Sequence, residues 1–244
     1  MEIALLLFIT FIAASVQSAT GFGFALIVVP VFLILLNSTD AIQIAIIISV
    51  AMSVVHFIKL RNIAPYHLLR WLSIGGIAGF PVGILIYNML DLGAIKMAVA
   101  IFIILISLQN GWNMIRKNLT PEGQKESKIL QIIVGVISGI LGAAMAMPGP
   151  VLMLYLSRTT LNKNEIRAAM IAFFVFAYTG ALVLQILLVG IQKETWITSA
   201  LLIPISLLGV YAGHQISKKI NERLFKALVL VILIITGVFM LINL

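Results

Sequence analysis

Long apolar stretches follow one another along the chain, and short groups of charged and turn-forming residues separate them. Most of these stretches reach about 20 residues, the length that an α-helix needs to cross the hydrocarbon core of a bilayer. Eight such blocks can be delimited: Ile3 to Leu36, Ala41 to Ile58, Leu68 to Leu90, Gly93 to Ile115, Ile129 to Leu156, Ile166 to Ile191, Trp196 to Ile216, and Leu224 to Leu244. The pattern predicts an all-α polytopic membrane protein.

Two of these blocks, the first and the fifth, carry helix-breaking residues in their interiors. The first is interrupted at Thr20-Gly21-Phe22-Gly23, and the fifth at Met147-Pro148-Gly149-Pro150. Proline removes a helix donor and clashes with the preceding turn, and glycine is the other common breaker. We therefore expect a broken helix at each place, as a re-entrant hairpin or as a tilted span with a broken centre.

The distribution of basic residues favours the hairpins. If all eight blocks crossed the membrane once, the Lys and Arg residues would divide evenly between the two sides, which contradicts the excess of positive charge expected in cytoplasmic loops. If blocks one and five instead enter and leave on the same face, every Lys and Arg except Lys96 and Lys193 lies on one side. This arrangement places both termini outside and the polar segment 116–128 inside, as a cytoplasmic linker.

The two halves of the chain resemble each other. Gly79 and Gly209, Gly83 and Gly213, and Lys96 and Lys226 are each separated by 130 residues. We interpret this as a duplication, with residues 1–115 as the first membrane repeat and residues 129–244 as the second. Each repeat then holds one hairpin and three spans, an odd number, so the two repeats are expected to be inverted, as in many transporters.

Composition narrows the class of protein. Hydrophobic residues make up 62% of the 244 positions and charged residues 10%, which excludes an ordinary soluble domain. The absence of cysteine excludes disulfides and thiolate sites. The net charge of +8 is explained by basic cytoplasmic loops, so we expect no nucleic-acid partner. A signal peptide carries positive charge before its apolar stretch, but here the acidic Glu2 precedes that stretch and no Lys or Arg does. We therefore expect the first apolar stretch to remain in the mature protein.

The two breaks are the main candidates for chemistry. A helix that starts inside the membrane presents N–H groups without intrahelical partners and the positive end of its dipole, which together attract a small anion. Hydroxyl and amide donors near the breaks suit oxyanions or sulfonates, and methionine tolerates a polarisable partner. The candidate substrate-binding residues are Gln17, Ser18, Thr20, Gly21, Gly23, Ser138, Met147, Pro148, Gly149 and Arg167.

The remaining polar residues give weaker indications of function. All eight acidic residues fall at block ends or in loops, which argues against a cation pump built on a carboxylate inside the membrane. The three histidines lack the spacing of metal ligands, so we expect no metal and no cofactor. The four-residue spacing of Gly75, Gly79 and Gly83 predicts close helix packing.

Several segments carry a resemblance to a known family. They are the run from Ala13-Ala14-Ser15 through Gly21-Phe22-Gly23 to Pro30, the run from Gly135 through Gly139-Ile140-Leu141-Gly142 to Pro148-Gly149-Pro150, and the stretch Asn164-Glu165-Ile166-Arg167-Ala168-Ala169. Together they resemble the sulfite exporter TauE/SafE family over nearly the whole chain. The resemblance implies a multi-pass inner-membrane carrier of sulfur-containing anions such as sulfite, sulfonates, sulfoacetate or thiosulfate.

We therefore expect a secondary transporter or facilitator of small anions that works by alternating access around a central site, and not an enzyme. Two alternatives come from other classes. One is a lipid-carrier flippase, which would need a lateral opening. The other is an intramembrane serine hydrolase, for which Ser138 and His214 are the obvious pair, although no Gly-x-Ser elbow precedes the serine.

Overall fold

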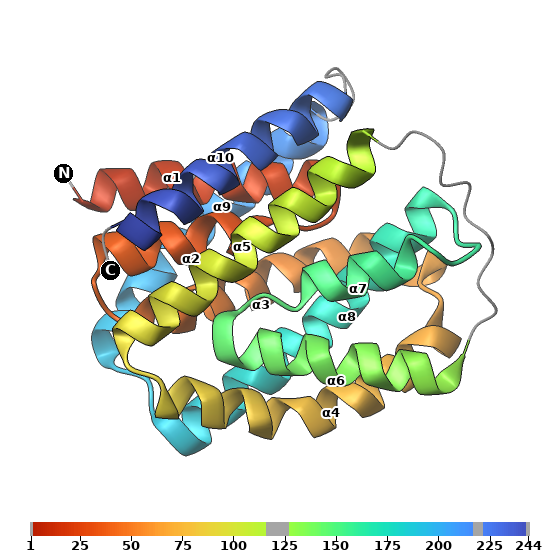
Figure 1. The fold of residues 1–244 in the computed structure, drawn as a ribbon, viewed down its shortest axis with the longest axis horizontal. Coiled ribbons are helices and arrows are strands. Elements are labelled where there is room, and N and C mark those ends of the chain that lie inside the picture. Colours follow the sequence, from red (N-terminus) through yellow and green to blue (C-terminus); the bar gives the residue numbers. More distant parts are fainter. Residues whose placement is uncertain (1, 116–126, 217–221, 243–244) are drawn as a thin grey trace.

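A computed structural model describes residues 2–115, 127–216 and 222–242 of the chain (Figure 1). Within these ranges the secondary structure is entirely helical, with no strand. Most of the expected linker, residues 116–126, lies outside the described part. The prediction of an all-α membrane protein is confirmed, because seven of the described helices are long and apolar enough to cross a membrane.

The first half of the chain contains five α-helices and one short 3₁₀ turn. They are α1 (Glu2–Thr20), α2 (Phe24–Leu35), α3 (Asp40–Leu60), η1 (Arg61–Ile63), α4 (Tyr66–Met89) and α5 (Leu92–Ile115). The 12 residues of α2 extend only about 18 Å, well short of the hydrocarbon core. The other four α-helices are candidate spans.

The second half repeats this order of long and short helices. It contains α6 (Lys128–Met145), α7 (Gly149–Leu156), α8 (Lys163–Leu184), the π-helical turn η2 (Gln185–Val189), α9 (Lys193–Ile216) and α10 (Glu222–Ile242). The short member here is α7, with 8 residues. The last helix, α10, has 21 residues.

Both short helices fold back along the helix that precedes them. In Figure 1, α1 runs away from the N-terminus and α2 turns back towards it, while α6 and α7 make the same turn in the opposite direction. The chain ends marked N and C lie at the same end of the bundle. The ends of α4 and η2 lie at this end too, whereas η1 and the start of α8 lie at the other.

Glycines allow α4 and α6 to touch through their backbones. A β-carbon built on Gly75 would lie 2.1 Å from the carbonyl oxygen of Ile132, and one on Gly79 would lie 2.2 Å from that of Val136. From the other helix, a β-carbon on Gly135 would lie 2.1 Å from the carbonyl oxygen of Leu72. No real side chain fits at such distances, so the predicted glycine packing joins α4 to α6.

The contact between α1 and α9 is built in the same way. A β-carbon on Gly209 would lie 2.5 Å from the carbonyl oxygen of Phe11, and one on Gly213 would lie 2.2 Å from that of Ser15. The Ser15 hydroxyl also donates to the carbonyl of Gly209 at 3.0 Å. The first helix of each half thus packs on the third long helix of the other half.

We expect Gly79→Ala to destabilise the protein, because the added methyl group meets a backbone carbonyl that no rotamer change can move away. Overpacking of this kind costs about 1–3 kcal/mol. Gly111→Ala is the matched control, since a β-carbon there has no neighbour within 4 Å. Thermal unfolding followed by size-exclusion chromatography in detergent should give a lower Tm for Gly79→Ala alone. Equal Tm values for the two variants would contradict the close α4–α6 contact.

Candidate functional site

The connection between α1 and α2 is short and depends on glycine. The N–H of Gly21 donates to the carbonyl of Gln17 at 2.8 Å, which closes the last turn of α1. Gly21 then has φ +90° and Gly23 has φ +115°, both in the left-handed region that other residues rarely adopt. These angles reverse the chain within three residues, and α2 starts at Phe24.

Gln17 connects the two sides of this first break. Its Oε1 accepts the N–H of Phe24 at 3.2 Å, so it satisfies one of the N–H groups that the start of α2 would otherwise leave unpaired. The side chain is 1% exposed, and its Nε2 has no hydrogen-bond partner. Gln17 therefore offers a buried, unused amide donor directly beside the helix start.

The hydroxyl groups near the first break are already engaged. The Ser18 hydroxyl donates to the carbonyl of Val210 in α9 at 2.7 Å. The Thr20 hydroxyl contacts the carbonyls of Val16 and Phe22, which ties it to its own backbone. Both side chains thus stabilise the shape of the break, and neither donor is free for a ligand in this conformation.

The second break uses alanine and proline where the first uses glycine. Ala146 ends α6 in the left-handed conformation, with φ 58°. Its N–H donates to the carbonyl of Gly142 at 3.1 Å, and the N–H of Met147 donates to that of Leu141 at 3.1 Å. The carbonyl of Ala146 in turn accepts the Tyr178 hydroxyl of α8 at 3.1 Å. Pro148 precedes α7 as its N-cap residue.

The two breaks meet each other. A β-carbon on Gly149, the first residue of α7, would lie 3.6 Å from the β-carbon of Phe22 in the first break. It would also lie 3.0 Å from Cζ of Phe174 in α8. Gly149 is therefore the residue at which the start of α7, the first break and the middle of α8 come together. Met147 is buried beside it in the sequence, with 1% exposure.

Arg167 extends from the first turns of α8 to the first break. A reciprocal capping box between Asn162 and Glu165 fixes the start of this helix. From there, Arg167 donates through Nη2 to the carbonyl of Ser18, and its Cγ would lie 3.3 Å from a β-carbon on Gly21. Its Nε is buried and has no hydrogen-bond partner. A cationic donor is thus held against the end of α1.

The two breaks lie at different levels along α8. Arg167, which contacts the first break, lies four residues after Lys163, the start of the helix. Phe174, which contacts the second, lies eleven residues after it in a helix of 22. The seven residues between them correspond to about 10 Å along the helix axis. The second break is therefore near the middle of α8, while the first extends from the level of Arg167, which lies against Gly21, to Phe22, which lies against Gly149.

Further basic groups lie near Arg167. His56, at the end of α3, is within electrostatic range of Arg167, Lys59 and His214. His56 is 7% exposed, and its Nδ1 has no hydrogen-bond partner. This basic group occupies the end of the bundle where α8 starts.

Ser138 is the candidate that lies apart from the others. It is fully buried in α6, seven residues before Met145, or about two helical turns from the second break. Its hydroxyl has no hydrogen-bond partner. No base therefore contacts the Ser138 hydroxyl among the described residues, and the serine–histidine pair with His214 is not assembled.

The sequence did not single out two features of the structure. Phe174 and Tyr178 cover the second break, with ring centroids 5.6 Å apart. Their four-residue spacing on one helix was the available signal, but it does not reveal which face of α8 points to a break. The other feature is a hydrogen bond between buried amides, from Nε2 of Gln43 to Oε1 of Gln185 at 2.9 Å.

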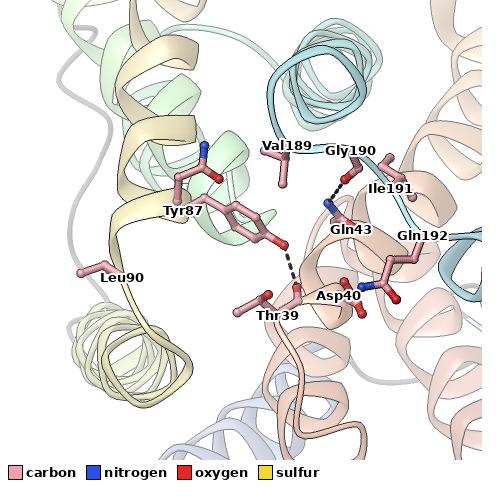
Figure 2. Close-up of a pocket in the computed structure, with 10 residues that line it drawn as sticks. Thr39, Asp40, Gln43, Tyr87, Leu90, Val189, Gly190, Ile191 and Gln192 are labelled. Atoms are coloured by element: carbon pink, nitrogen blue, oxygen red, sulfur yellow. Dashed lines mark hydrogen bonds between the residues drawn. The ribbon is translucent and has the colours of Figure 1, made fainter.

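These amides lie beside a pocket at the end of the bundle that holds both termini (Figure 2). The pocket has a volume of about 570 Å³ and lies between α3, the end of α4 and the segment after η2. Figure 2 shows Tyr87 on one wall and Gln192 on the opposite wall, with Asp40 beside Gln192. The hydroxyl of Tyr87 donates to the carbonyl of Thr39 at 3.2 Å across the pocket.

A comparison with protein families matches one of them. The model of the sulfite exporter TauE/SafE family covers residues 6–240, which is nearly the whole chain. No curated protein and no solved structure matched the chain. The family is one of membrane transporters, which implies a small anionic substrate and agrees with seven helices able to span a bilayer. The chain belongs to the sulfite exporter TauE/SafE family.

Proposed function

We propose that the protein is an inner-membrane carrier of small sulfur-containing anions, and that it binds them where the two helix breaks meet. The observation that carries this proposal is the contact between Gly149 and Phe22, with Arg167 held against the first break. The start of α7 thereby meets the break that leads into α2, and a guanidinium lies against that same break. Each of these features stabilises negative charge.

The donors without partners define how the anion is held. Gln17 contributes Nε2 and Arg167 contributes Nε, and neither makes a hydrogen bond in the structure. The backbone N–H of Gly149 adds a third donor, because the first N–H groups of a helix have no intrahelical partner. An oxyanion with three outward oxygens, such as sulfite or a sulfonate, matches several donors that approach from different helices.

The apolar side chains at the breaks suit the rest of such a substrate. Phe22 and Phe174 lie against Gly149, and the buried Met147 stands two residues before it in the chain. Aromatic rings and a thioether exclude water, and they accommodate the short carbon chain of an organic sulfonate or the outer sulfur of thiosulfate. We propose that these three residues set the size of the anion, while the donors set its charge.

Alternating access follows from a proposed pair of inverted repeats. The supporting observation is that equivalent helices make equivalent contacts. Gly79 and Gly83 of α4 face α6, while Gly209 and Gly213, each 130 residues later, face α1. The turns of α1–α2 and α6–α7 run in opposite directions. We propose that rocking of one repeat against the other exposes the anion to each side in turn.

Arg167 is expected to contribute to substrate affinity. Arg167→Gln removes the charge but keeps a polar side chain, so a charge-assisted hydrogen bond of about 1.5–3 kcal/mol would be lost, or about 10- to 100-fold in apparent KM. Sulfite, thiosulfate and taurine uptake should be measured in proteoliposomes. Arg158→Gln is the control, since Arg158 is exposed near the same end of the bundle. Unchanged uptake in Arg167→Gln would contradict the proposed site.

The hairpin topology makes its own prediction, which can be tested with single cysteines because the chain has none. If both hairpins enter and leave on one face, cysteines replacing Asn88 and Glu194 should react with an impermeant thiol reagent from outside intact cells. Cysteines replacing Asn62 and Arg158 should react only after permeabilisation. If α1–α2 and α6–α7 each crossed the membrane once, position 88 would instead share a side with position 158, and position 62 with position 194.

A further inference from the structure

The pocket at the end of the bundle that holds both termini is lined by several polar side chains and, among the described residues, by no positive charge. The described residues that line it include Asp40 but no Lys, Arg or His. The amides of Gln43, Asn88 and Gln192 supply further polar atoms. Lys96, near the same end, donates to Asn37 Oδ1 at 2.7 Å rather than to Asp40. The pocket is therefore unsuited to an anion and suited to a cation.

The hydrogen bonds of Gln43 fix which way its amide points. Nε2 donates to the carbonyl of Gly190 at 3.0 Å and to Oε1 of Gln185 at 2.9 Å. Because a backbone carbonyl can only accept, the amide cannot be turned over without losing the bond to Gly190. Oε1 of Gln43 is therefore the atom without a hydrogen-bond partner, in a side chain that is 2% exposed.

An unpaired acceptor buried at the wall of a pocket needs a ligand that is electron-poor. We propose that this pocket binds a sodium ion, held by the carboxylate of Asp40 and the amide oxygen of Gln43. Carboxylate, amide and water oxygens are the ligands that hard metal cations prefer. A single carboxylate among neutral oxygens favours a monovalent ion, since divalent sites usually gather several carboxylates. A proton is a poorer match, because an amide oxygen does not take up a proton near neutral pH.

The position of the site suggests what the ion does, and this step rests on the proposed function. Gln43 belongs to α3 of the first half, while Gln185 begins η2 and Gly190 directly follows it in the second half. An ion on Gln43 therefore acts on the contact between the two halves. We infer that sodium is the coupling ion of the anion carrier, and that it also compensates the charge of the substrate.

Sodium binding can be measured without any transport. The purified protein in detergent should be unfolded thermally in increasing NaCl against equal concentrations of choline chloride. We expect a saturable, sodium-specific rise in Tm for the wild-type protein. Loss of even an outer-shell partner of a metal ligand lowers affinity about 10- to 100-fold, so Asp40→Asn should weaken sodium binding at least about tenfold.

Asp91→Asn is the matched control. It makes the same chemical change near the same end, at a carboxylate that accepts the N–H of Ala94 at 2.7 Å and does not line the pocket. Gln43→Leu should also abolish the sodium response. If that variant does not fold, the sodium response of Asp40→Asn is by itself the test of the site. A response that Asp40→Asn retains, or the absence of any sodium-specific response in the wild-type protein, would overturn the site.

Proteoliposomes then separate this inference from the proposed function. Anion uptake that depends on an inward sodium gradient, and loses that dependence in Asp40→Asn, supports both. Sodium binding without any anion uptake would support the sodium site and contradict the proposed carrier function. Anion uptake that is equal in sodium and choline, with no sodium binding, would contradict the sodium site and support the proposed carrier function.

Discussion

The arrangement of the whole molecule depends on direct backbone contact between helices of different halves. In a bilayer the lipid is as apolar as the helices, so close van der Waals packing has to supply the attraction that the hydrophobic effect supplies in water. Gly79 against α6 and Gly213 against α1 provide it, with β-carbon positions 2.2 Å from backbone oxygens. These contacts hold the helices that end at the two breaks, and thereby set where the breaks meet.

The sequence predicts the location of the breaks better than their surroundings. Both breaks lie beside glycine or proline, since α1 ends at Thr20 directly before Gly21 and α7 begins at Gly149 directly after Pro148. These residue types do not end every helix that contains them, because Gly79 and Pro81 lie inside α4. The four-residue glycine spacing likewise predicts close packing. It does not name the partner helix, because an apolar helix face carries no information about which other apolar face it meets.

The hydroxyl groups show why a list of site residues cannot be completed from sequence. Serine and threonine inside a membrane helix can serve a ligand or a backbone carbonyl. The Ser18 hydroxyl donates to the carbonyl of Val210, 192 residues away, and the Thr20 hydroxyl donates to a carbonyl of its own helix. The free donors are instead Gln17 and Arg167. Only the three-dimensional contacts decide which donors are occupied, since these contacts join segments from opposite halves of the chain.

The antiparallel helices α3 and α8 carry different polar groups at their two ends. Arg167 at the start of α8 lies within electrostatic range of His56 near the end of α3, so one end of the pair is basic. At the other end lie the carboxylate of Asp40 at the start of α3 and the amides of Gln43 and Gln185. An anion between these ends is drawn towards the basic one, and a cation would be drawn the opposite way. If the proposed anion and sodium sites are both used, coupled movement of the two ions is favoured over free diffusion of either, because each ion lowers the electrostatic cost of the other.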